Sequence, residues 1–103
     1  MVTVVALFNL KPGVSVEQYE AWAGMYDLPT VRGLSSVQSF EILRAQGLLS
    51  GDGASPYQYV EVLRIESVDA MRAGIKATPA MAAIQAQFQQ FADAPLFIVT
   101  TPI

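Results

Sequence analysis

The sequence predicts a single α+β domain in which two helices cover one face of a four-stranded antiparallel sheet. Hydrophobic residues recur with the period of a strand or of a helix in the order β-α-β-β-α-β along the chain. The chain has 103 residues, which is enough for one hydrophobic core but not for two. Residues 1–103 are therefore expected to form one domain without an internal linker.

The first predicted strand, Val2–Leu10, is apolar on both faces, which is typical of a buried strand, and the turn Lys11-Pro12-Gly13 ends it. Ser15 then begins a helix, because Gln18 lies three residues later and completes a capping box. Apolar side chains at three- and four-residue spacing give this helix one inward-facing stripe, made of Val16, Tyr19, Trp22, Ala23 and Tyr26.

Asp27-Leu28-Pro29 is expected to end the first helix, since the residue before a proline is pushed out of the helical region. One further helical turn fits into Pro29–Gly33. The second strand is predicted at Ser36–Ala45 and the third at Tyr57–Ile65. Gln46–Pro56, which is rich in small residues, forms the loop between them.

Ser67 is expected to cap a second helical region, which is interrupted at Thr78-Pro79. At that point the threonine can cap a new helix whose first residue is the proline. An amphipathic stripe follows, made of Met81, Ile84, Phe88 and Phe91. Pro95 then opens the last predicted strand, Leu96–Thr101.

This order of elements is that of a ferredoxin-like fold, whose helices leave the other face of the sheet uncovered. Side chains expected on this outer face are apolar, among them Val5, Leu7, Val60 and Val62. Hydrophobic residues make up 52% of the chain and charged residues only 15%, which is apolar for so small a domain. We therefore expect a homodimer that pairs the two outer sheet faces.

Composition excludes several classes of function. The formal net charge is −3 and the six Lys and Arg residues form no cluster, so nucleic acid is not an expected partner. The chain has no cysteine and no histidine, which excludes disulfides, thiol catalysis, histidine-based metal sites and histidine general bases. We expect neither a metal nor a cofactor.

No apolar run approaches the roughly 20 residues that a membrane-spanning helix needs, so a membrane is not an expected partner. Met1–Leu10 is apolar, but it lacks a basic leader and runs directly into the turn at Lys11-Pro12-Gly13, which does not fit a signal peptide. The expected location is cytoplasmic.

Glu61 is the most informative residue, because it stands in the middle of an apolar strand. Tyr59 and Leu63 share its sheet face at two-residue spacing, and valines occupy the other face. A covered carboxylate needs a hydrogen bond, a cation or a proton of its own. If the helices cover this face, the expected walls of a hollow are Val4, Ala6, Phe8, Trp22, Tyr26, Tyr59, Glu61 and Leu63.

Two interpretations of this group stay open. In the first, Glu61 is a general acid and base whose pKa burial raises toward neutrality, and Tyr59 donates a hydrogen bond to a developing oxyanion. Such a pair supports enolisation, cyclisation, dehydration or tautomerisation without a metal or cofactor. In the second, the phenols and the carboxylate satisfy one another in a packed core.

Asp27 and Arg32 form a second candidate pair. An acid at a helix end and an arginine five residues later can meet across a turn in a charge-assisted hydrogen bond that fixes the connection. Alternatively, Arg32 directs its cation at a carboxylate or enolate of a ligand.

The chain resembles the REDY-like (HapK-type) proteins of prodiginine-type pigment clusters, within the dimeric α+β-barrel superfamily. The residues that carry the resemblance are Val4–Pro12, Tyr19-Glu20 with Trp22, Asp27–Leu34, Val37, Ser39 and Phe40. The resemblance covers essentially the whole chain, and Asp27–Leu34 is its most specific part. It implies a small cytoplasmic homodimer linked to the tailoring of pyrrole- or indole-type metabolites.

A more distant resemblance is to the plant stress-responsive barrel proteins, whose enzymatic members include olivetolic acid cyclase. It implies that Trp22 and Tyr26 are pocket aromatics and that Tyr59 replaces a pocket histidine. Met81 falls near the position of the catalytic histidine, and a methionine cannot act as a base. The location of the hollow is therefore implied for this chain, but the polyketide-cyclase mechanism is not.

Three functional hypotheses follow. The first is a cofactor-free enzyme acting on a flat aromatic or pyrrolic intermediate, with Glu61 and Tyr59 as the catalytic pair. In it Trp22 and Tyr26 are the stacking walls and Arg32 is an optional anchor for the ligand. The further ligand-binding residues are Phe8, Asp27 and Met81. The second is a non-catalytic carrier that shields a reactive intermediate, and the third is a structural partner of a biosynthetic enzyme.

Overall fold

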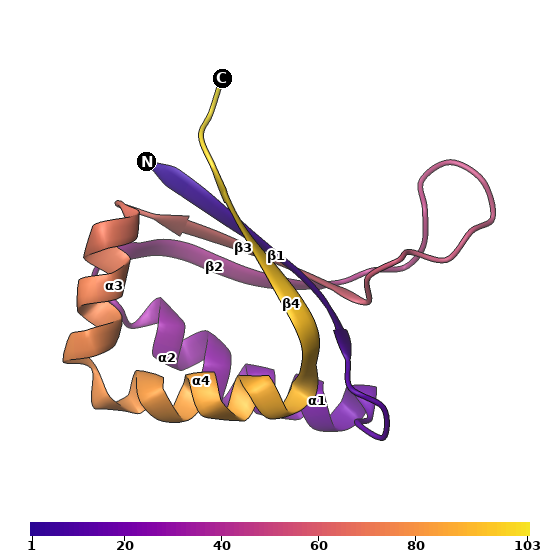
Figure 1. Cartoon of the computed structure of the whole chain (residues 1–103), viewed down its shortest axis with the longest axis horizontal. Coiled ribbons are helices and arrows are strands. Elements are labelled where there is room, and N and C mark those ends of the chain that lie inside the picture. The colour runs from indigo at the N-terminus through magenta and orange to yellow at the C-terminus, as the bar shows by residue number, and fades with distance from the viewer.

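The computed structural model describes residues 1–103 and confirms the predicted α+β fold (Figure 1). Its four strands form one antiparallel sheet in the order β2-β3-β1-β4. The helices lie on one side of this sheet (Figure 1). The elements are β1 Val2–Leu10, α1 Val16–Trp22, η1 Ala23–Asp27, α2 Leu28–Arg32, β2 Val37–Arg44, β3 Tyr59–Ile65, α3 Val68–Ala77, α4 Pro79–Phe91 and β4 Ala92–Thr100.

Strand register places Glu61 on the face that the helices cover. Glu61 pairs with Ala6 of β1 and with Ile42 of β2, so it lies in the interior of the sheet and not at an edge. Its neighbours on the same face of β3 are Tyr59 and Leu63, as strand alternation predicts. Of these two cross-strand neighbours, Ala6 has the smaller side chain and is itself buried.

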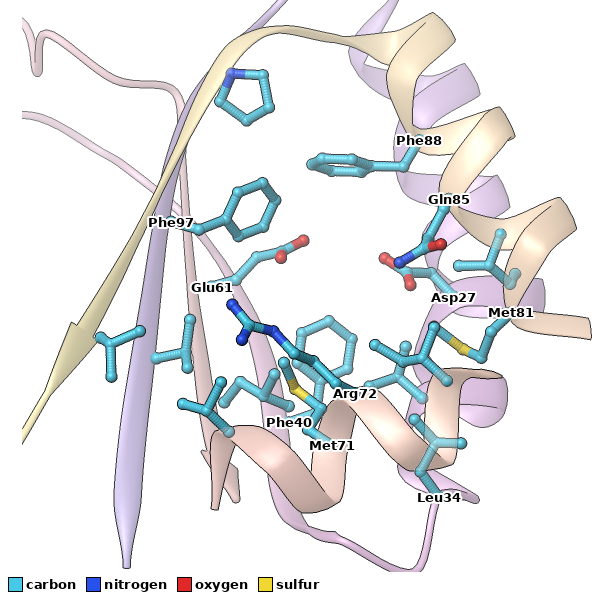
Figure 2. Close-up of a pocket in the computed structure, with 18 of the residues that line it drawn as sticks. Asp27, Leu34, Phe40, Glu61, Met71, Arg72, Met81, Gln85, Phe88 and Phe97 are labelled. Carbon is cyan, nitrogen blue, oxygen red and sulfur yellow. The ribbon is translucent and has the colours of Figure 1, made fainter. Parts of the chain in front are cut away.

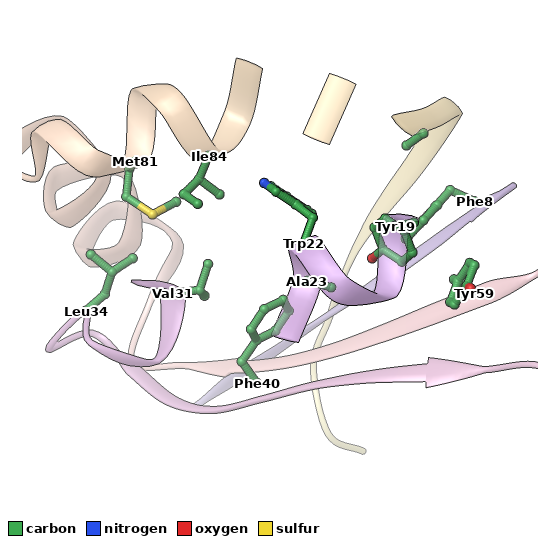
Figure 3. Close-up of a cluster of buried hydrophobic side chains, with 11 residues drawn as sticks. Phe8, Tyr19, Trp22, Ala23, Val31, Leu34, Phe40, Tyr59, Met81 and Ile84 are labelled. Atoms are coloured by element: carbon green, nitrogen blue, oxygen red, sulfur yellow. The ribbon is translucent and has the colours of Figure 1, made fainter. Parts of the chain in front are cut away.

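The hydrophobic core lies between the sheet and the helices and is rich in aromatic rings (Figure 3). Phe8 and Tyr59 stack with their ring centroids 5.5 Å apart, and the ring of Tyr19 meets that of Tyr59 edge-on at 4.8 Å. All three residues are at most 1% exposed. This aromatic cluster fixes α1 against β1 and β3, and it belongs to the packed core.

The first helix begins as predicted but does not end where predicted. The hydroxyl of Ser15 accepts from the backbone N–H of Gln18, and the Gln18 side chain accepts from the backbone N–H of Ser15. Beyond Trp22 the chain stays helical through the π-helical segment η1 and then through α2. The prediction that Asp27-Leu28-Pro29 ends the helix is therefore wrong.

The π-helical turn explains how a proline fits into this helix. The N–H of Leu28 donates to the carbonyl of Ala23, five residues earlier, which widens the backbone just before Pro29. A proline in a regular α-helix clashes with the carbonyl four residues before it, and the wider turn relieves that clash.

The second half of the chain shows two boundary differences. The third strand begins at Tyr59, and Tyr57 is instead hydrogen-bonded to Ser55, whose hydroxyl donates to the Tyr57 carbonyl. The last strand begins at Ala92 and includes Pro95, not after it. Proline is tolerated there because β4 is an edge strand and its pairing with β1 shifts register at this point.

Both predicted helix starts in this half are present. The hydroxyl of Ser67 accepts from the N–H of Ala70 and caps α3. Thr78 occupies the N-cap position of α4, with Pro79 as the first helical residue, but the threonine side chain makes no capping hydrogen bond. None of the helices combines the length and the apolar character that crossing a membrane requires.

The outer face of the sheet is apolar, as predicted. Val5, Leu7, Val60 and Val62 are half-buried there. The exposed side chains of the flanking strands extend this surface, and they are Leu43, Leu96 and Ile98.

Candidate functional site

A cavity of about 560 Å³ lies between the sheet and the helices, and Glu61 is part of its wall (Figure 2). Its walls come from β1, β2, β3 and β4 on one side and from η1, α2, α3 and α4 on the other. Most of the lining is apolar. The lining residues are Val4, Asp27, Val31, Leu34, Phe40, Glu61, Leu63, Val68, Met71, Arg72, Ile75, Met81, Ile84, Gln85, Phe88, Gln89, Pro95, Phe97 and Val99.

Glu61 carries a carboxyl group that the fold removes from water without supplying a partner. The residue is 7% exposed, and its Oε2 atom is buried without a hydrogen bond. Burial, together with the negative charge of Asp27, raises the pKa of Glu61 to about 8. Figure 2 shows this carboxyl group directed from the sheet into the cavity.

Asp27 brings a second buried carboxyl group to the same cavity. It is the last residue of η1 and is 4% exposed. Burial raises the pKa of Asp27 to about 6. In Figure 2 its side chain enters the cavity from the helical layer, on the wall opposite Glu61. The π-helical turn thus contains the one buried acid of this helix. Such turns occur frequently at functional sites.

These two carboxyl groups differ in protonation near neutral pH. With a pKa of about 6, Asp27 is mostly ionised at pH 7, whereas Glu61, with a pKa of about 8, mostly keeps its proton. Two carboxyl groups whose pKa values are pushed apart can act as base and acid on one substrate. The cavity therefore has a proton acceptor on one wall and a proton donor on the other.

Tyr59 does not line this cavity, so its expected place in the cavity wall is wrong. Its hydroxyl donates to the Oε2 atom of Glu20 at 2.7 Å. Arg44 donates to the same carboxylate, through Nε at 2.6 Å and through its terminal nitrogen at 2.5 Å. Alternation put Tyr59 and Glu61 on one sheet face correctly, but the longer phenol reaches α1 and not its neighbour on the strand.

Three expected aromatic walls also lie elsewhere. Phe8 is completely buried in the core, and Trp22 packs in the same cluster and donates from Nε1 to Gln87 at 2.6 Å (Figure 3). Tyr26 is 52% exposed, since it lies on the solvent side of η1. Met81, in contrast, is 4% exposed and lines the cavity.

The expected pairing of Asp27 with Arg32 is wrong. Arg32 donates from Nε to the backbone carbonyl of Phe40 at 3.0 Å, and this bond ties the end of α2 to β2. Continued helix places the two residues on different sides of the element, so Asp27 faces the cavity while Arg32 faces outward and is exposed.

Several lining residues were not foreseen from the sequence, notably Arg72 and Gln85. Arg72 is in the middle of α3 and Gln85 in α4, and their side chains point toward the cavity in Figure 2. A helical wheel of α3 puts Arg72 on the same side as Val68 and Ile75, and that apolar stripe is the signal that could have found it.

Tyr19 is a further buried polar group behind the cavity wall. Its hydroxyl is buried without a hydrogen-bond partner. Burial and the nearby charges of Glu61 and Asp27 raise the pKa of this phenol far above its usual range. No group of three or more His, Cys, Asp or Glu side chains lies together in a way that suits a metal ion.

Comparisons with known proteins point to one family. The family model described as REDY-like protein HapK matches residues 2–103. The solved structure of HapK from Hahella chejuensis is 27% identical, with a TM-score of 0.77, and the match covers 100% of this chain and 93% of that chain. No curated protein sequence matches.

Two more distant structures share the fold. A dimeric ferredoxin-like protein of unknown function from Thermobifida fusca is 18% identical, with a TM-score of 0.74, over 98% of this chain and 90% of that chain. SnoaB from Streptomyces nogalater, described as a cofactor-independent oxygenase, is 15% identical, with a TM-score of 0.73, over 98% of this chain and 91% of that chain. At these identities the likeness establishes architecture alone.

Proposed function

The chain belongs to the family of REDY-like HapK proteins, and from that premise we propose that it is a small biosynthetic protein that catalyses proton transfer on a flat aromatic or pyrrolic intermediate. The reaction takes place in the cavity between sheet and helices. It uses the two buried carboxyl groups and needs no cofactor. The proposal includes enolisation, tautomerisation, dehydration and cyclisation, which all begin with the same proton movements.

One observation carries this proposal, namely the two unlike carboxyl groups on opposite walls of an apolar cavity. Asp27, with a pKa of about 6, is the base that removes a proton from an activated C–H or N–H group. Glu61, with a pKa of about 8, is the acid that donates its proton to the developing oxyanion. The catalytic pair proposed here is therefore Glu61 with Asp27, and Tyr59 stabilises the fold.

The lining of the cavity supports a flat apolar substrate. Phe88 and Phe97 stand in the wall near Glu61, and the aliphatic residues around Met81 form the other end (Figure 2). A volume of about 560 Å³ lies within the usual range for small-molecule pockets. A pyrrole- or indole-type metabolite, which membership of the family suggests, fits this chemistry.

Hydrogen–deuterium exchange into a flat activated ketone tests the proposed chemistry without knowledge of the natural substrate. Indanone in deuterated buffer should exchange faster with the protein than without it, and NMR measures the rate. The rate should peak between pH 6 and 8, where Asp27 is ionised and Glu61 is protonated.

Matched variants separate catalysis from binding. Glu61→Gln and Asp27→Asn should each lower the exchange rate at least about 100-fold, yet change ketone affinity by less than about tenfold. Glu41→Gln removes an exposed glutamate from β2 and should change neither quantity. Full exchange activity in Glu61→Gln would exclude the proposed role of that residue.

A non-catalytic carrier is the second candidate, and the accessibility of the cavity favours it. Phe97 and Gln85 both line the cavity and are both exposed to solvent, so the cavity is accessible from outside. A carrier should bind flat aromatic probes without accelerating exchange, and Phe88→Ala should weaken that binding. Glu61→Gln should then leave both properties unchanged.

We further propose that two copies pair through the outer sheet face. The exposed Leu43, Leu96 and Ile98 stand beside half-buried valines on that face and form a continuous apolar surface. Light scattering coupled to gel filtration should give twice the chain mass of 11.1 kDa. Ile98→Glu should produce a monomer, whereas Glu17→Gln, at an exposed position of α1 in the helical layer, should not.

A further inference from the structure

Two exposed cations lie on one side of α3: Arg72 at the exposed edge of the cavity, here called its mouth, and Lys76 one helical turn farther along. Arg72 lines the cavity itself (Figure 2). Arg72 and Lys76 also line a second, open hollow of about 510 Å³, together with Gln85 of α4. Because the two hollows share Arg72, Ile75 and Gln85, they adjoin each other between α3 and α4.

Neither cation is used by the fold. The one ion pair of the chain joins Arg44 to Glu20, and the arginine side chains that donate hydrogen bonds are those of Arg32 and Arg44. Lys76 is in the last turn of α3, where the helix dipole favours a cation. Arg72 is in the middle of the helix and gains nothing from the dipole.

The spacing of the two cations is itself unfavourable. Four residues separate them, so they lie on the same side of the helix, where like charges repel each other. Asp69, three residues before Arg72, forms no ion pair with it, and no acidic residue lines the second hollow to offset this repulsion. A bound anion would remove it.

We propose that Arg72 and Lys76 bind the carboxylate of an aromatic acid whose ring lies in the apolar part of the cavity, in front of Glu61. The inference rests on the proposed function only in placing the ligand in this cavity. The planar guanidinium of Arg72 can donate two parallel N–H groups to a carboxylate, and Lys76 adds a second positive charge. The amide of Gln85 completes the polar mouth.

This arrangement orients the ligand. With its acidic group held at the mouth, the far end of the ring system points toward Asp27 and Glu61. The anchor also keeps the negative charge of the ligand away from the ionised Asp27, which would repel it.

Calorimetric titration with a matched pair of probes tests the proposal. Naphthoate and naphthamide have the same ring and differ in charge. The wild-type protein should bind naphthoate about tenfold more tightly than naphthamide, as expected for a charge-assisted pair at a partly exposed site. Arg72→Gln should remove this preference while leaving the affinity for naphthamide within about twofold, and Lys76→Gln should reduce the preference less.

Two controls make the result specific. Lys11→Gln removes a cation from the exposed turn after β1 and should leave the preference intact. Naphthyl phosphate tests the class of anion. Equal binding of naphthoate and naphthamide, a preference that survives in Arg72→Gln, no binding of either probe, or a large preference for the phosphate would each overturn the proposal.

The same titrations distinguish this inference from the proposed function. If Arg72 sets the naphthoate preference but Glu61→Gln leaves proton exchange unchanged, the anchor stands and the acid–base function falls. If Glu61→Gln abolishes exchange but Arg72→Gln leaves the preference intact, the acid–base function stands and the anchor falls.

Discussion

Glu20 and Glu61 lie in the same layer between helices and sheet, and the fold treats their charges in opposite ways. Glu20 accepts hydrogen bonds from Tyr59 and from Arg44, which lower its pKa. Glu61 is two residues from Tyr59 on β3, yet one of its oxygens has no partner and burial raises its pKa to about 8. The difference separates a polar group that holds the fold together from one that is left free beside a cavity.

That contrast shows that the fold does not maximise its stability at Glu61. The Glu20–Arg44–Tyr59 group joins α1 to β2 and β3 through three hydrogen bonds to one carboxylate. An unpaired buried carboxyl group, in contrast, costs free energy whenever it is ionised. Retaining such a group at Glu61 makes sense if a ligand or a proton in transit uses it.

The largest expected effect is that of Glu61→Gln on stability at high pH. The folded-state pKa of about 8 lies above the ordinary value of 4.5, so the folded protein binds the proton more tightly than the unfolded chain does. The contribution of the Glu61 carboxyl group to the free energy of unfolding is therefore complete below about pH 4 and is lost as the pH rises to about 8. Glu61→Gln should raise the free energy of unfolding by about 4 kcal/mol at pH 8 and hardly change it at pH 4.

Urea denaturation at the two pH values measures this difference. Glu41→Gln, on the exposed side of β2, serves as the control and should change stability little at either pH. An increase in stability that is the same at pH 4 and pH 8 would show that the Glu61 carboxyl group keeps an ordinary pKa.

A smaller change in stability is expected when the hydroxyl of either Tyr59 or Tyr19 is removed. Tyr59→Phe removes the 2.7 Å bond to Glu20 and should cost about 1–2 kcal/mol. Tyr19→Phe removes a buried hydroxyl without a partner and should leave stability unchanged or raise it by up to about 1 kcal/mol. Thermal unfolding of both variants gives the comparison, and equal losses would contradict it.

The smallest effect is that of Glu20→Gln, with the opposite pH dependence. The pKa of Glu20 is lowered, so its contribution is present above the ordinary carboxyl pKa and is lost as the pH falls. Because its side chain is 33% exposed, water screens the pair with Arg44, and the loss at pH 7 should be only about 0.5–1 kcal/mol. Denaturation at pH 3 should show no difference from the wild-type protein.

Local patterns predicted the fold well, because each of them depends on near neighbours in the sequence. Val2–Leu10 and the Ser15–Gln18 capping box were correct to the residue. Alternation along β3 also put Glu61 on the helix-covered face. These features follow from period and capping chemistry, which tertiary contacts did not override here.

Features that depend on packing could not be predicted in this way. A proline normally ends a helix. Here the wider π-helical turn of η1 lets the helix continue through Pro29 and brings Asp27 into the cavity. Arg72 lies at the cavity, whereas Arg32 is bonded to the Phe40 carbonyl. This difference depends on how α3 packs against the sheet, which the sequence alone does not reveal. A two-residue spacing likewise could not reveal that the phenol of Tyr59 reaches Glu20.

Titration of the Glu61 carboxyl carbon by NMR tests the central claim most directly. With the carbon of glutamate side chains labelled, the Glu61 signal should change with a midpoint near pH 8, well above the ordinary glutamate value of 4.5. Asp27→Asn should lower that midpoint, because it removes the neighbouring negative charge. A Glu61 midpoint near the ordinary value of 4.5 would contradict the account.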